Sequence, residues 1–456
     1  MDRDAEQLEK LGYAQQLLRD MGGFANFALS FSIISVLTGA VTLYGHGLKY
    51  GGPIEMFLGW PMVTVLTLSI ALSLGELASA YPTAGALYHW SSHLGGRGAG
   101  FLTAWLNTIG QFAITAGIDY GLAEFVAAML GFTDRPRTLG ICAVILVSHA
   151  VLNHLGVRLV ARLNDLSAWV HIAGVGILVG TLAFFAPHQP AAFLLQSHAS
   201  DGHGFFIGLL LACWTFTGYD ASAHVSEETH DPSRNAPWGI VLSVAVSGVA
   251  GYALLLAVTL SIGDLEKAVI ADNPFIFVLT SALGARLGNG LVLIAMAAMW
   301  FCGLSSVTSN SRMLFAFARD GGLPFSPKLA TVSPRFRSPW VAVWTSAGAA
   351  LAVALWADAY SAMVALSTIA LYASYGLPIL FHLIGRTLPP GPWNLGRHSK
   401  TMNVLAIVWI GTTLVLFVLP PNQLAGYTFA ACLAALWLYW RFDQRDRFKG
   451  PPPFTA

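Results

Sequence analysis

The stretch FFIGLLLACWTFTGYDASAHVSEE, residues Phe205–Glu228, is apolar enough to cross a membrane but is interrupted at its middle. A transmembrane helix needs about 20 mostly apolar residues, which this stretch supplies. Thr217, Gly218 and Asp220 lie near its centre, where an uninterrupted helix in lipid would carry apolar side chains. Non-helical backbone at that depth is tolerated only where it is buried in protein or lines a water-filled cavity. The stretch therefore predicts a broken transmembrane helix beside a cavity.

The composition of the whole chain places it in a membrane. Of its 456 residues, 55% are hydrophobic and only 10% are charged, whereas soluble domains carry about 25% charged residues. A chain of this length cannot hide so much apolar surface in ordinary soluble cores. This excludes a soluble enzyme, a nucleic-acid-binding protein and a disordered scaffold. The net charge of +1 predicts neither an acidic nor a basic partner.

Twelve apolar stretches are long enough to be membrane-spanning helices. They lack the ten-residue alternation that is typical of outer-membrane β-barrels, so we predict an all-α integral membrane protein. The approximate bounds of the stretches are 23–46, 54–80, 98–130, 138–155, 162–187, 203–225, 236–262, 288–317, 338–356, 360–386, 402–419 and 424–441.

The predicted loops on the side of the two chain ends carry more Lys and Arg than the loops on the opposite side. Short cytoplasmic loops are enriched in these residues, so we expect both ends of the chain, residues 1–21 and 442–456, in the cytoplasm. The cytoplasmic or plasma membrane is the expected location. Arg312, near the inner end of the eighth stretch, either snorkels to the interface or pairs with a carboxylate. The basic residues that this orientation leaves outside are Lys49, Arg135, Arg137, Lys267 and Arg286.

The four cysteines are scattered through apolar stretches without a C-x-x-C pair. Such thiols are typical of packing residues and not of a disulfide framework or a zinc site. We find no H-E-x-x-H motif, nucleophile elbow or pair of catalytic carboxylates within a span. We therefore expect no metal, no cofactor and no enzymatic activity. The cysteines are Cys142, Cys213, Cys302 and Cys432.

The first stretch is interrupted in the same way as the sixth. In FALSFSIISVLTGAVTLYGHG, Phe27–Gly47, several hydroxyl side chains surround Gly39 at mid-membrane depth. Small residues also let membrane helices pack closely, which is the simpler interpretation of glycine alone. Asp220 favours the functional one, because an ionisable residue at this depth is costly. Interrupted spans at corresponding positions in two halves indicate the substrate site of a transporter.

Three long motifs carry a resemblance to a known group of proteins. They are SLGELASAYPTAGALYHW (Ser73–Trp90), GYDASAHVSEETHDPSRNAPWGI (Gly218–Ile240) and SNSRMLFAFARDGGLP (Ser309–Pro324). They resemble the second, sixth and eighth helices of the amino acid–polyamine–organocation superfamily of permeases. LEKLGYAQQLLRDMGGFANFALSFSIIS (Leu8–Ser35) is closest to its amino acid/choline/GABA permease branch.

The resemblance implies twelve transmembrane helices in a LeuT-type arrangement. Ten helices in residues 22–386 would form two inverted five-helix repeats with helices 1 and 6 broken. The repeats would cover about 22–187 and 203–386, and residues 387–441 would add helices 11 and 12. Substrate would sit at the midplane between the broken helices, which the interruptions in the sequence also indicate.

The break in the first stretch is our candidate site for a substrate carboxylate. A half-helix that begins after a break offers free N–H groups and the positive end of its dipole to an anion. Unwound carbonyl groups around Thr217, Gly218 and Asp220 would face an ammonium group, and glycine permits that backbone. The residues predicted to bind the carboxylate are Ser35, Val36, Leu37, Thr38 and Gly39.

Rings and amides near the breaks complete the predicted site. Trp214, Phe216 and Tyr219 could close over the substrate and stack on an alkylammonium group, but such rings are equally typical of core and interface positions. Asn107 and Gln111 are four residues apart and share a helical face. They either line the cavity or hold helices together.

Two positions bear on the coupling ion. In LNDLSAWVHIAGVGILV, Leu163–Val179, His171 occupies the place where the resemblance implies a lysine in proton-coupled relatives. Histidine titrates near neutral pH and can act as a proton switch, although a lone buried histidine also serves as a packing residue. Ser305 and Ser306 would instead suit a sodium ion between helices 1 and 8, as the resemblance implies.

Charged residues at inner helix ends are candidates for a cytoplasmic gate. Glu76, Glu227 and Glu228 lie in the family motifs, and we expect them to pair with inner arginines such as Arg319. Exposed pairs of this kind contribute little, so a gate requires that they be buried.

We expect a secondary transporter that moves an amino acid or a derived amine, such as GABA, together with protons. A sodium-coupled or exchange-mode carrier of the same fold and a choline-like organocation carrier are the alternatives. The expected partners are the small-molecule substrate, the proton and membrane lipid, without nucleic acid. A channel is disfavoured because no repeated selectivity filter is present.

Overall fold

The computed structural model describes residues 3–198, 202–357, 360–385, 389 and 391–452. This part of the chain is helical throughout, and its only β-type pairing is an isolated bridge between Met21 and Thr229. The all-α prediction is therefore confirmed. The predicted boundary at residues 386–387 and the end of the predicted tail, 453–456, lie outside the described residues.

In the part of the chain that the structure describes, the helices follow one another without intervening strands. The first half contains α1 (Arg3–Lys10), α2 (Gly23–Ile34), α3 (Gly39–Thr42), α4 (Tyr44–Tyr50), η1 (Glu55–Gly59), α5 (Trp60–Ala80), α6 (Leu87–Gly95), α7 (Arg97–Met129), α8 (Arg135–His154), α9 (Val157–Phe185) and η2 (Ala191–Leu195). The second half contains α10 (Gly202–Gly208), α11 (Leu210–Thr215), α12 (Ala221–His224), η3 (Ser226–Glu228), α13 (Pro232–Leu260), α14 (Leu265–Ile270), α15 (Pro274–Arg319), α16 (Ser326–Leu329), α17 (Trp340–Trp356), α18 (Tyr360–Leu383), η4 (Gly396–His398), α19 (Ser399–Leu416), α20 (Gln423–Tyr439), η5 (Trp440–Gln444) and α21 (Arg445–Arg447).

Nine segments of the described chain are long and apolar enough to cross a membrane. All nine fall on stretches that hydropathy predicts. The other three predicted stretches hold shorter helices, namely α10–α12, α17 and α20. The nine segments are Gly23–Thr42, Glu55–Ala80, Arg97–Met129, Arg135–His154, Val157–Phe185, Pro232–Leu260, Pro274–Arg319, Tyr360–Leu383 and Gly396–Leu416.

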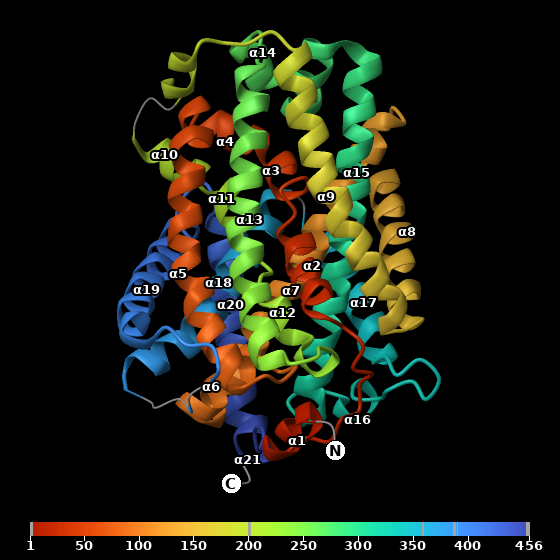
Figure 1. Cartoon of the computed structure of the whole chain (residues 1–456), viewed down its shortest axis with the longest axis vertical. Helices are drawn as coiled ribbons and strands as arrows, with labels where there is room; N and C mark the ends of the chain where they lie inside the picture. Colours follow the sequence, from red (N-terminus) through yellow and green to blue (C-terminus); the bar gives the residue numbers. More distant parts are fainter. Residues whose placement is uncertain (1–2, 199–201, 358–359, 386–388, 390, 453–456) are drawn as a thin grey trace.

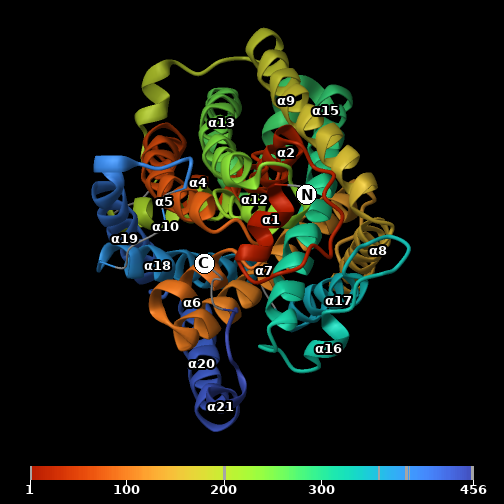
Figure 2. The ribbon, with the colours of Figure 1, turned by 60° about the horizontal axis from the view of Figure 1, so that its bottom comes forward.

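The long helices stand side by side in one upright bundle (Figure 1). Both marked chain ends lie at the same end of the bundle, where α1 and α21 are found. Seen from that end, α12 lies near the centre, whereas α20 and α21 lie at the periphery (Figure 2). The helices α2, α7, α9, α13, α15 and α18 pack against one another and enclose the short helices α3, α11 and α12.

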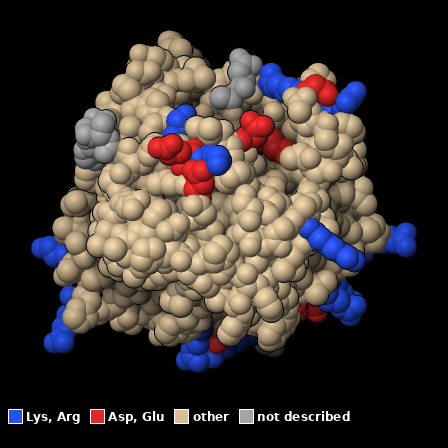
Figure 3. All heavy atoms as spheres, turned by 90° about the horizontal axis from the view of Figure 1, so that it is seen from above, with Lys and Arg blue, Asp and Glu red and all other residues tan. Residues whose placement is uncertain are grey.

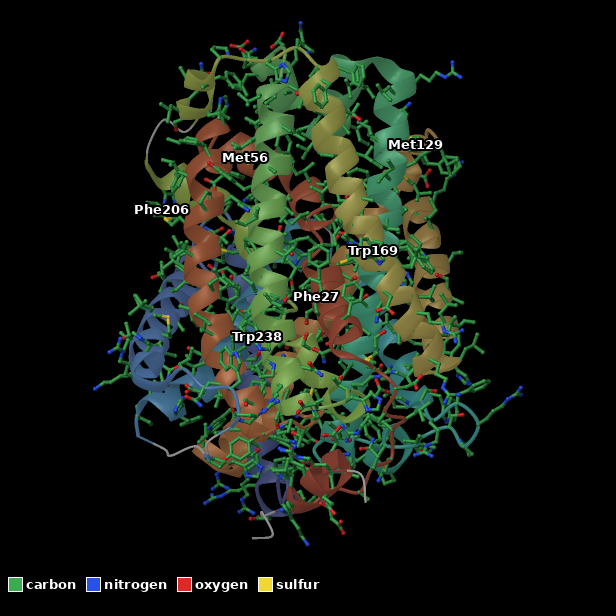
Figure 4. The ribbon with its side chains drawn as sticks, viewed as in Figure 1. Phe27, Met56, Met129, Trp169, Phe206 and Trp238 are labelled. Carbon is green, nitrogen blue, oxygen red and sulfur yellow. The ribbon has the colours of Figure 1, made fainter. Side chains whose placement is uncertain are left out.

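The outer surface of the bundle is apolar, as a lipid environment requires. Trp169 on α9 and Trp238 on α13 are 62% and 49% exposed and project outward (Figure 4). Viewed from the end opposite the termini, charged side chains form only scattered patches on an otherwise uncharged surface (Figure 3). In a soluble protein such large exposed apolar residues would be a liability.

Candidate functional site

The first predicted transmembrane helix is broken at Ser35. Helix α2 ends at Ile34, Ser35 has φ 20° and ψ 90°, and α3 begins at Gly39. Within the described residues, the N–H groups of Val36 and Leu37 donate to no acceptor. The residues from Ser35 to Gly39 are all buried. The break therefore leaves buried donors, which a ligand can satisfy.

The sixth predicted helix is broken between α11 and α12. Gly218 has φ +87°, a conformation that side-chain-bearing residues rarely adopt. A Cβ at this position would lie 2.2 Å from Ile33 Cγ2 of α2. Likewise, a Cβ on Gly39 would lie 2.8 Å from the Cα of Thr215. Two glycines thus allow the two breaks to lie directly against each other.

A small cavity lies between the two breaks. Its volume is about 10 Å³, which is room for about one water molecule. Its walls come from α2, α3, α7 and α11, namely Ile33, Ile34, Thr38, Gly39, Ile114, Ile118, Trp214 and Thr215. A ligand the size of an amino acid does not fit until these helices move apart.

Of the three predicted rings, only Trp214 lines this cavity. Its indole N–H donates to Ser367 Oγ on α18 at 2.9 Å. The ring of Phe216 instead packs on Trp60, with 4.7 Å between centroids. The ring of Tyr219 packs on Tyr375 at 5.0 Å. Neither of these two rings is part of the cavity wall.

Asp220 is fully buried and bound by three side chains. Its Oδ1 accepts a hydrogen bond from Tyr375 Oη at 2.8 Å. Its Oδ2 lies 3.1 Å from both Asn107 Nδ2 and His224 Nε2. The carboxylate therefore links α7, α12 and α18, and no motif predicted Tyr375 as one of its partners.

The predicted amides on α7 contact neighbouring helices. Asn107 binds Asp220, as described above, and Gln111 Nε2 donates to Ser309 Oγ on α15 at 3.3 Å. Neither side chain lines the small cavity in this conformation. Of the two interpretations left open by the sequence, the contacts favour helix-to-helix bonding.

His171 connects α9 to the break in α2. Its Nε2 lies 2.7 Å from Ser35 Oγ, and its Nδ1 lies 2.8 Å from the carbonyl oxygen of Ser167. Ser35 Oγ in turn lies 2.6 Å from Thr38 Oγ1, and Thr38 lines the cavity. A chain of hydrogen bonds thus runs from the buried imidazole to the cavity wall.

The candidate sodium ligands are both engaged with other helices. Ser305 Oγ donates to Asn164 Oδ1 on α9 at 3.0 Å, and Ser306 Oγ lies 2.7 Å from Thr115 Oγ1 on α7. Cys302 on α15 contacts α2, because its Sγ donates to the carbonyl of Ile33 at 3.3 Å. Among the described residues, no group of three or more His, Cys, Asp or Glu side chains is arranged to hold a metal ion.

Two buried ion pairs close the end of the bundle that carries the termini. Arg319 donates to both oxygens of Glu227 at 2.8 and 2.9 Å. Arg312 donates to both oxygens of Glu228 at 3.2 Å. Of the two sequence interpretations of Arg312, pairing is therefore the correct one. Burial raises the pKa of Glu227, but the charge and hydrogen bonds of Arg319 outweigh burial, so the pKa lies below its ordinary value.

The segment before α2 covers these pairs. The guanidinium of Arg319 lies 3.9 Å from the centroid of the Tyr13 ring. Gln15 donates to the carbonyl of Glu227, and Arg19 donates to that of Thr229. This segment is thus part of the closure and not a detached tail.

Among the described residues, the partners of Glu76 are not arginines. Its Oε1 accepts from the N–H of Leu395 at 3.1 Å, and its Oε2 accepts from Ser399 Oγ at 2.5 Å. The carboxylate therefore holds the start of α19 and is not part of the Glu227–Arg319 and Glu228–Arg312 pairs. The pairing depends on where the chain after α18 returns to the bundle, which the motif around Glu76 does not encode.

Comparison with known proteins assigns the family. A family model described as amino acid permease matches residues 22–440. Amino-acid permease BAT1 of Arabidopsis thaliana is 35% identical, over 99% of this chain and 96% of that protein. The BAT1 homolog of Oryza sativa subsp. japonica is 36% identical over the same shares. The GABA-specific permease of Saccharomyces cerevisiae is 27% identical, over 98% of this chain and 86% of that protein.

These matches confirm the resemblance to the amino acid–polyamine–organocation superfamily and agree with the expectation that the chain is a transporter and not an enzyme. The chain belongs to the amino acid permease family.

Proposed function

We propose that this protein is a secondary transporter of an amino acid or a derived amine such as GABA, that it works by alternating access, and that it is coupled to protons. The named relatives support this substrate class. The observation that carries the proposal is the closed cavity enclosed by two facing helix breaks. The division into two inverted repeats, 22–187 and 203–386, and the cytoplasmic location of both termini belong to the same proposal.

The substrate would bind at the breaks with its two charged groups apart. The unpaired N–H groups of Val36 and Leu37 suit a carboxylate. The carbonyl groups of Thr215, Phe216 and Thr217, which accept no hydrogen bond within the described residues, suit an ammonium group. Because the cavity holds about one water molecule, substrate entry requires α2–α3 and α11–α12 to separate from α7. That separation toward one side of the membrane and then the other is alternating access.

His171 would couple a proton to this site through the hydroxyl chain. A carbonyl oxygen only accepts, so the contact with Ser167 places a hydrogen on Nδ1. In the neutral ring Nε2 then accepts from Ser35, and Ser35 accepts from Thr38. In the protonated ring Nε2 donates, so both hydroxyls reverse and the Thr38 O–H is released toward the cavity. Proton binding would therefore supply one more donor for a substrate carboxylate.

Amino-acid chemistry is favoured over choline-like chemistry. A quaternary ammonium carrier needs an aromatic cage, but Phe216 and Tyr219 pack on Trp60 and Tyr375 and not around the cavity. A quaternary ammonium substrate would also leave the N–H groups of Val36 and Leu37 without an acceptor. Sodium coupling is less supported because Ser305 and Ser306 already bind Asn164 and Thr115.

Reconstituted proteoliposomes test the proposal. The purified protein is assayed for uptake of radiolabelled GABA, each proteinogenic amino acid, choline and ethanolamine, with and without an inward proton gradient and with and without sodium. We expect an inward proton gradient to stimulate the uptake of GABA or an amino acid when no sodium is present. Uptake of choline alone, or uptake that needs sodium and ignores the proton gradient, would overturn it.

A further inference from the structure

A second titratable pair lies inside the bundle, outside the proposed substrate and coupling sites. Asp119 on α7 and His149 on α8 are both fully buried, and Asp119 Oδ2 lies 3.4 Å from His149 Nδ1. Asp119 directly follows Ile118, which lines the cavity, but its carboxylate contacts α8. The other two polar atoms of the pair, Asp119 Oδ1 and His149 Nε2, have no hydrogen-bond partner among the described residues.

A third helix, α15, packs closely against this pair. Gly303 on α15 faces it, and a Cβ at that position would lie 2.0 Å from Asp119 Oδ1 and 2.5 Å from His149 Cε1. The ring of Trp300 covers the imidazole at 5.2 Å between centroids. With no side chain at 303, α15 can approach the carboxylate closely and exclude water from it.

The buried setting determines how many protons the pair holds. An ionised Asp119 beside a neutral His149 would be a net negative charge in an apolar interior, which is very costly. One added proton, either on the imidazole or on the carboxyl group, makes the pair neutral. Within the described chain, no lysine or arginine contacts the pair to supply this charge in another way. In the closed bundle, neutrality of the pair therefore requires one proton.

Few other titratable groups face the pair. The thiol of Cys142 on α8 and the thiol of Cys302 on α15 interact electrostatically with Asp119. The helices α17 and α18, which also pack on α7, contribute no titratable contact to the pair within the described residues. Arg312, further along α15, is held by Glu228. Neutrality thus depends on the proton itself.

The pair is mechanically connected to the break in α2. Cys302 binds the carbonyl of Ile33 in the last turn of α2, and the next residue, Gly303, contacts the pair. Movement of α2 against α15 would therefore change how closely α15 covers Asp119 and His149. Opening would admit water, and a hydrated carboxylate no longer needs the proton.

We propose that Asp119 and His149 form a second proton-binding site, which holds one proton while α7, α8 and α15 are closed and releases it when they open. The inference rests on the proposed transport function for its role in coupling. The charge of the pair changes from −1 to 0 when it binds the proton, and no other atom is transferred.

The first test measures protons moved per substrate in proteoliposomes, for GABA and, if GABA is not exchanged, for each proteinogenic amino acid. Asp119→Asn and His149→Gln should keep substrate exchange, which needs no net proton movement, but should lower the proton-to-substrate ratio. Glu266→Gln, an exposed acid on the short helix α14, should leave the ratio unchanged. An unchanged ratio in either pair variant with intact exchange would overturn this inference alone. Absence of exchange by the wild type for every compound would overturn the proposed function instead.

The second test does not depend on transport. An unfolded histidine loses its proton above its ordinary pKa of about 6.5, and the proposal requires that the folded pair keep the proton there. The thermal stability of the purified wild type should therefore fall as the pH rises above that value. The double variant Asp119→Asn/His149→Gln should show a shallower fall, and equal slopes would contradict a proton held by the pair. Gly303→Ala should also reduce the slope because its methyl group would force the pair apart.

Discussion

His224 Nε2 lies 3.1 Å from Asp220 Oδ2, and both side chains are fully buried. The other ring nitrogen, Nδ1, lies 3.0 Å from the carbonyl oxygen of Ala84, which only accepts, so Nδ1 carries a hydrogen. The N–H of Ala84 donates to Glu227 Oε1 at 3.1 Å. Contacts therefore continue from the break in the sixth helix to the ion pair with Arg319.

Replacing Asp220 should impair both the site and this connection. Asp220→Asn leaves one carbonyl oxygen where the two carboxylate oxygens accept from Asn107 and Tyr375, so at least one of these donors loses its partner. An unsatisfied buried group costs about 1–3 kcal/mol. We expect a lower thermal midpoint and at least about tenfold weaker substrate binding, which corresponds to ~1.4 kcal/mol. A scintillation-proximity assay measures the substrate affinity. The control is Asp272→Asn, in an exposed loop. Binding equal to that of the wild type would contradict a role for Asp220.

Replacing His171 should separate binding from coupling. His171→Ala removes the partner of Ser35 but leaves the backbone donors of the break. We expect substrate exchange to persist while accumulation driven by a proton gradient is lost. Ser35→Ala should do the same because it interrupts the chain to Thr38 while keeping the imidazole. Full gradient-driven accumulation in His171→Ala, measured by uptake into proteoliposomes, would rule out this histidine as the coupling site.

A side chain at Gly39 should block the closed state. The methyl group of Gly39→Ala would lie 2.8 Å from Thr215 Cα, a backbone atom that cannot rotate away. Overpacking of this kind costs about 1–3 kcal/mol, so uptake should fall by roughly five- to 150-fold. Gly176→Ala on α9, where a methyl group meets nothing within 4 Å, is the matched control. Equal uptake by the two variants would place the substrate elsewhere.

Removing one partner of the buried Glu227–Arg319 pair should destabilise the protein. Glu227→Gln leaves Arg319 without its carboxylate, and breaking a buried pair in this way costs about 3–5 kcal/mol. Thermal unfolding of Glu227→Gln, Arg319→Gln and the double variant forms a double-mutant cycle. We expect the double variant to lose less than the sum of the two single variants. Strict additivity would mean that the pair contributes nothing by pairing.

The stabilising contribution of the Glu227–Arg319 pair should not change with pH in the physiological range. The pKa of Glu227 lies below its ordinary value of 4.5, so its stabilising contribution is complete above that value. It is lost only as the pH falls through the lower pKa of the folded protein. The difference in thermal midpoint between the wild type and Glu227→Gln should therefore stay constant from about pH 5.5 to 7.5. A difference that shrinks over this interval would show that Glu227 titrates there.

Hydropathy alone predicts the nine helices of the described chain that are long and apolar enough to cross the membrane, and polar interruptions predict where two of the twelve apolar stretches break. Lipid offers no partner to backbone groups, so long apolar stretches such as 97–129 must be helical, whatever surrounds them. The same constraint makes the polar and glycine-rich interruptions at 35–39 and 215–220 informative. In both cases the residues of the segment itself are sufficient for the prediction.

Which side chains contact each other depends on how the helices pack. The partners of Asp220 come from α7, α12 and α18, and those of Glu76 from the start of α19, more than 300 positions away along the chain. Phe216 and Tyr219 look like lid residues in the sequence but are turned onto neighbouring rings by the unwound backbone. The contact of Asp119 with His149 depends on a glycine in a third helix. Hydropathy constrains each segment against lipid, but the direction of a side chain is set by packing between helices, which no single segment contains.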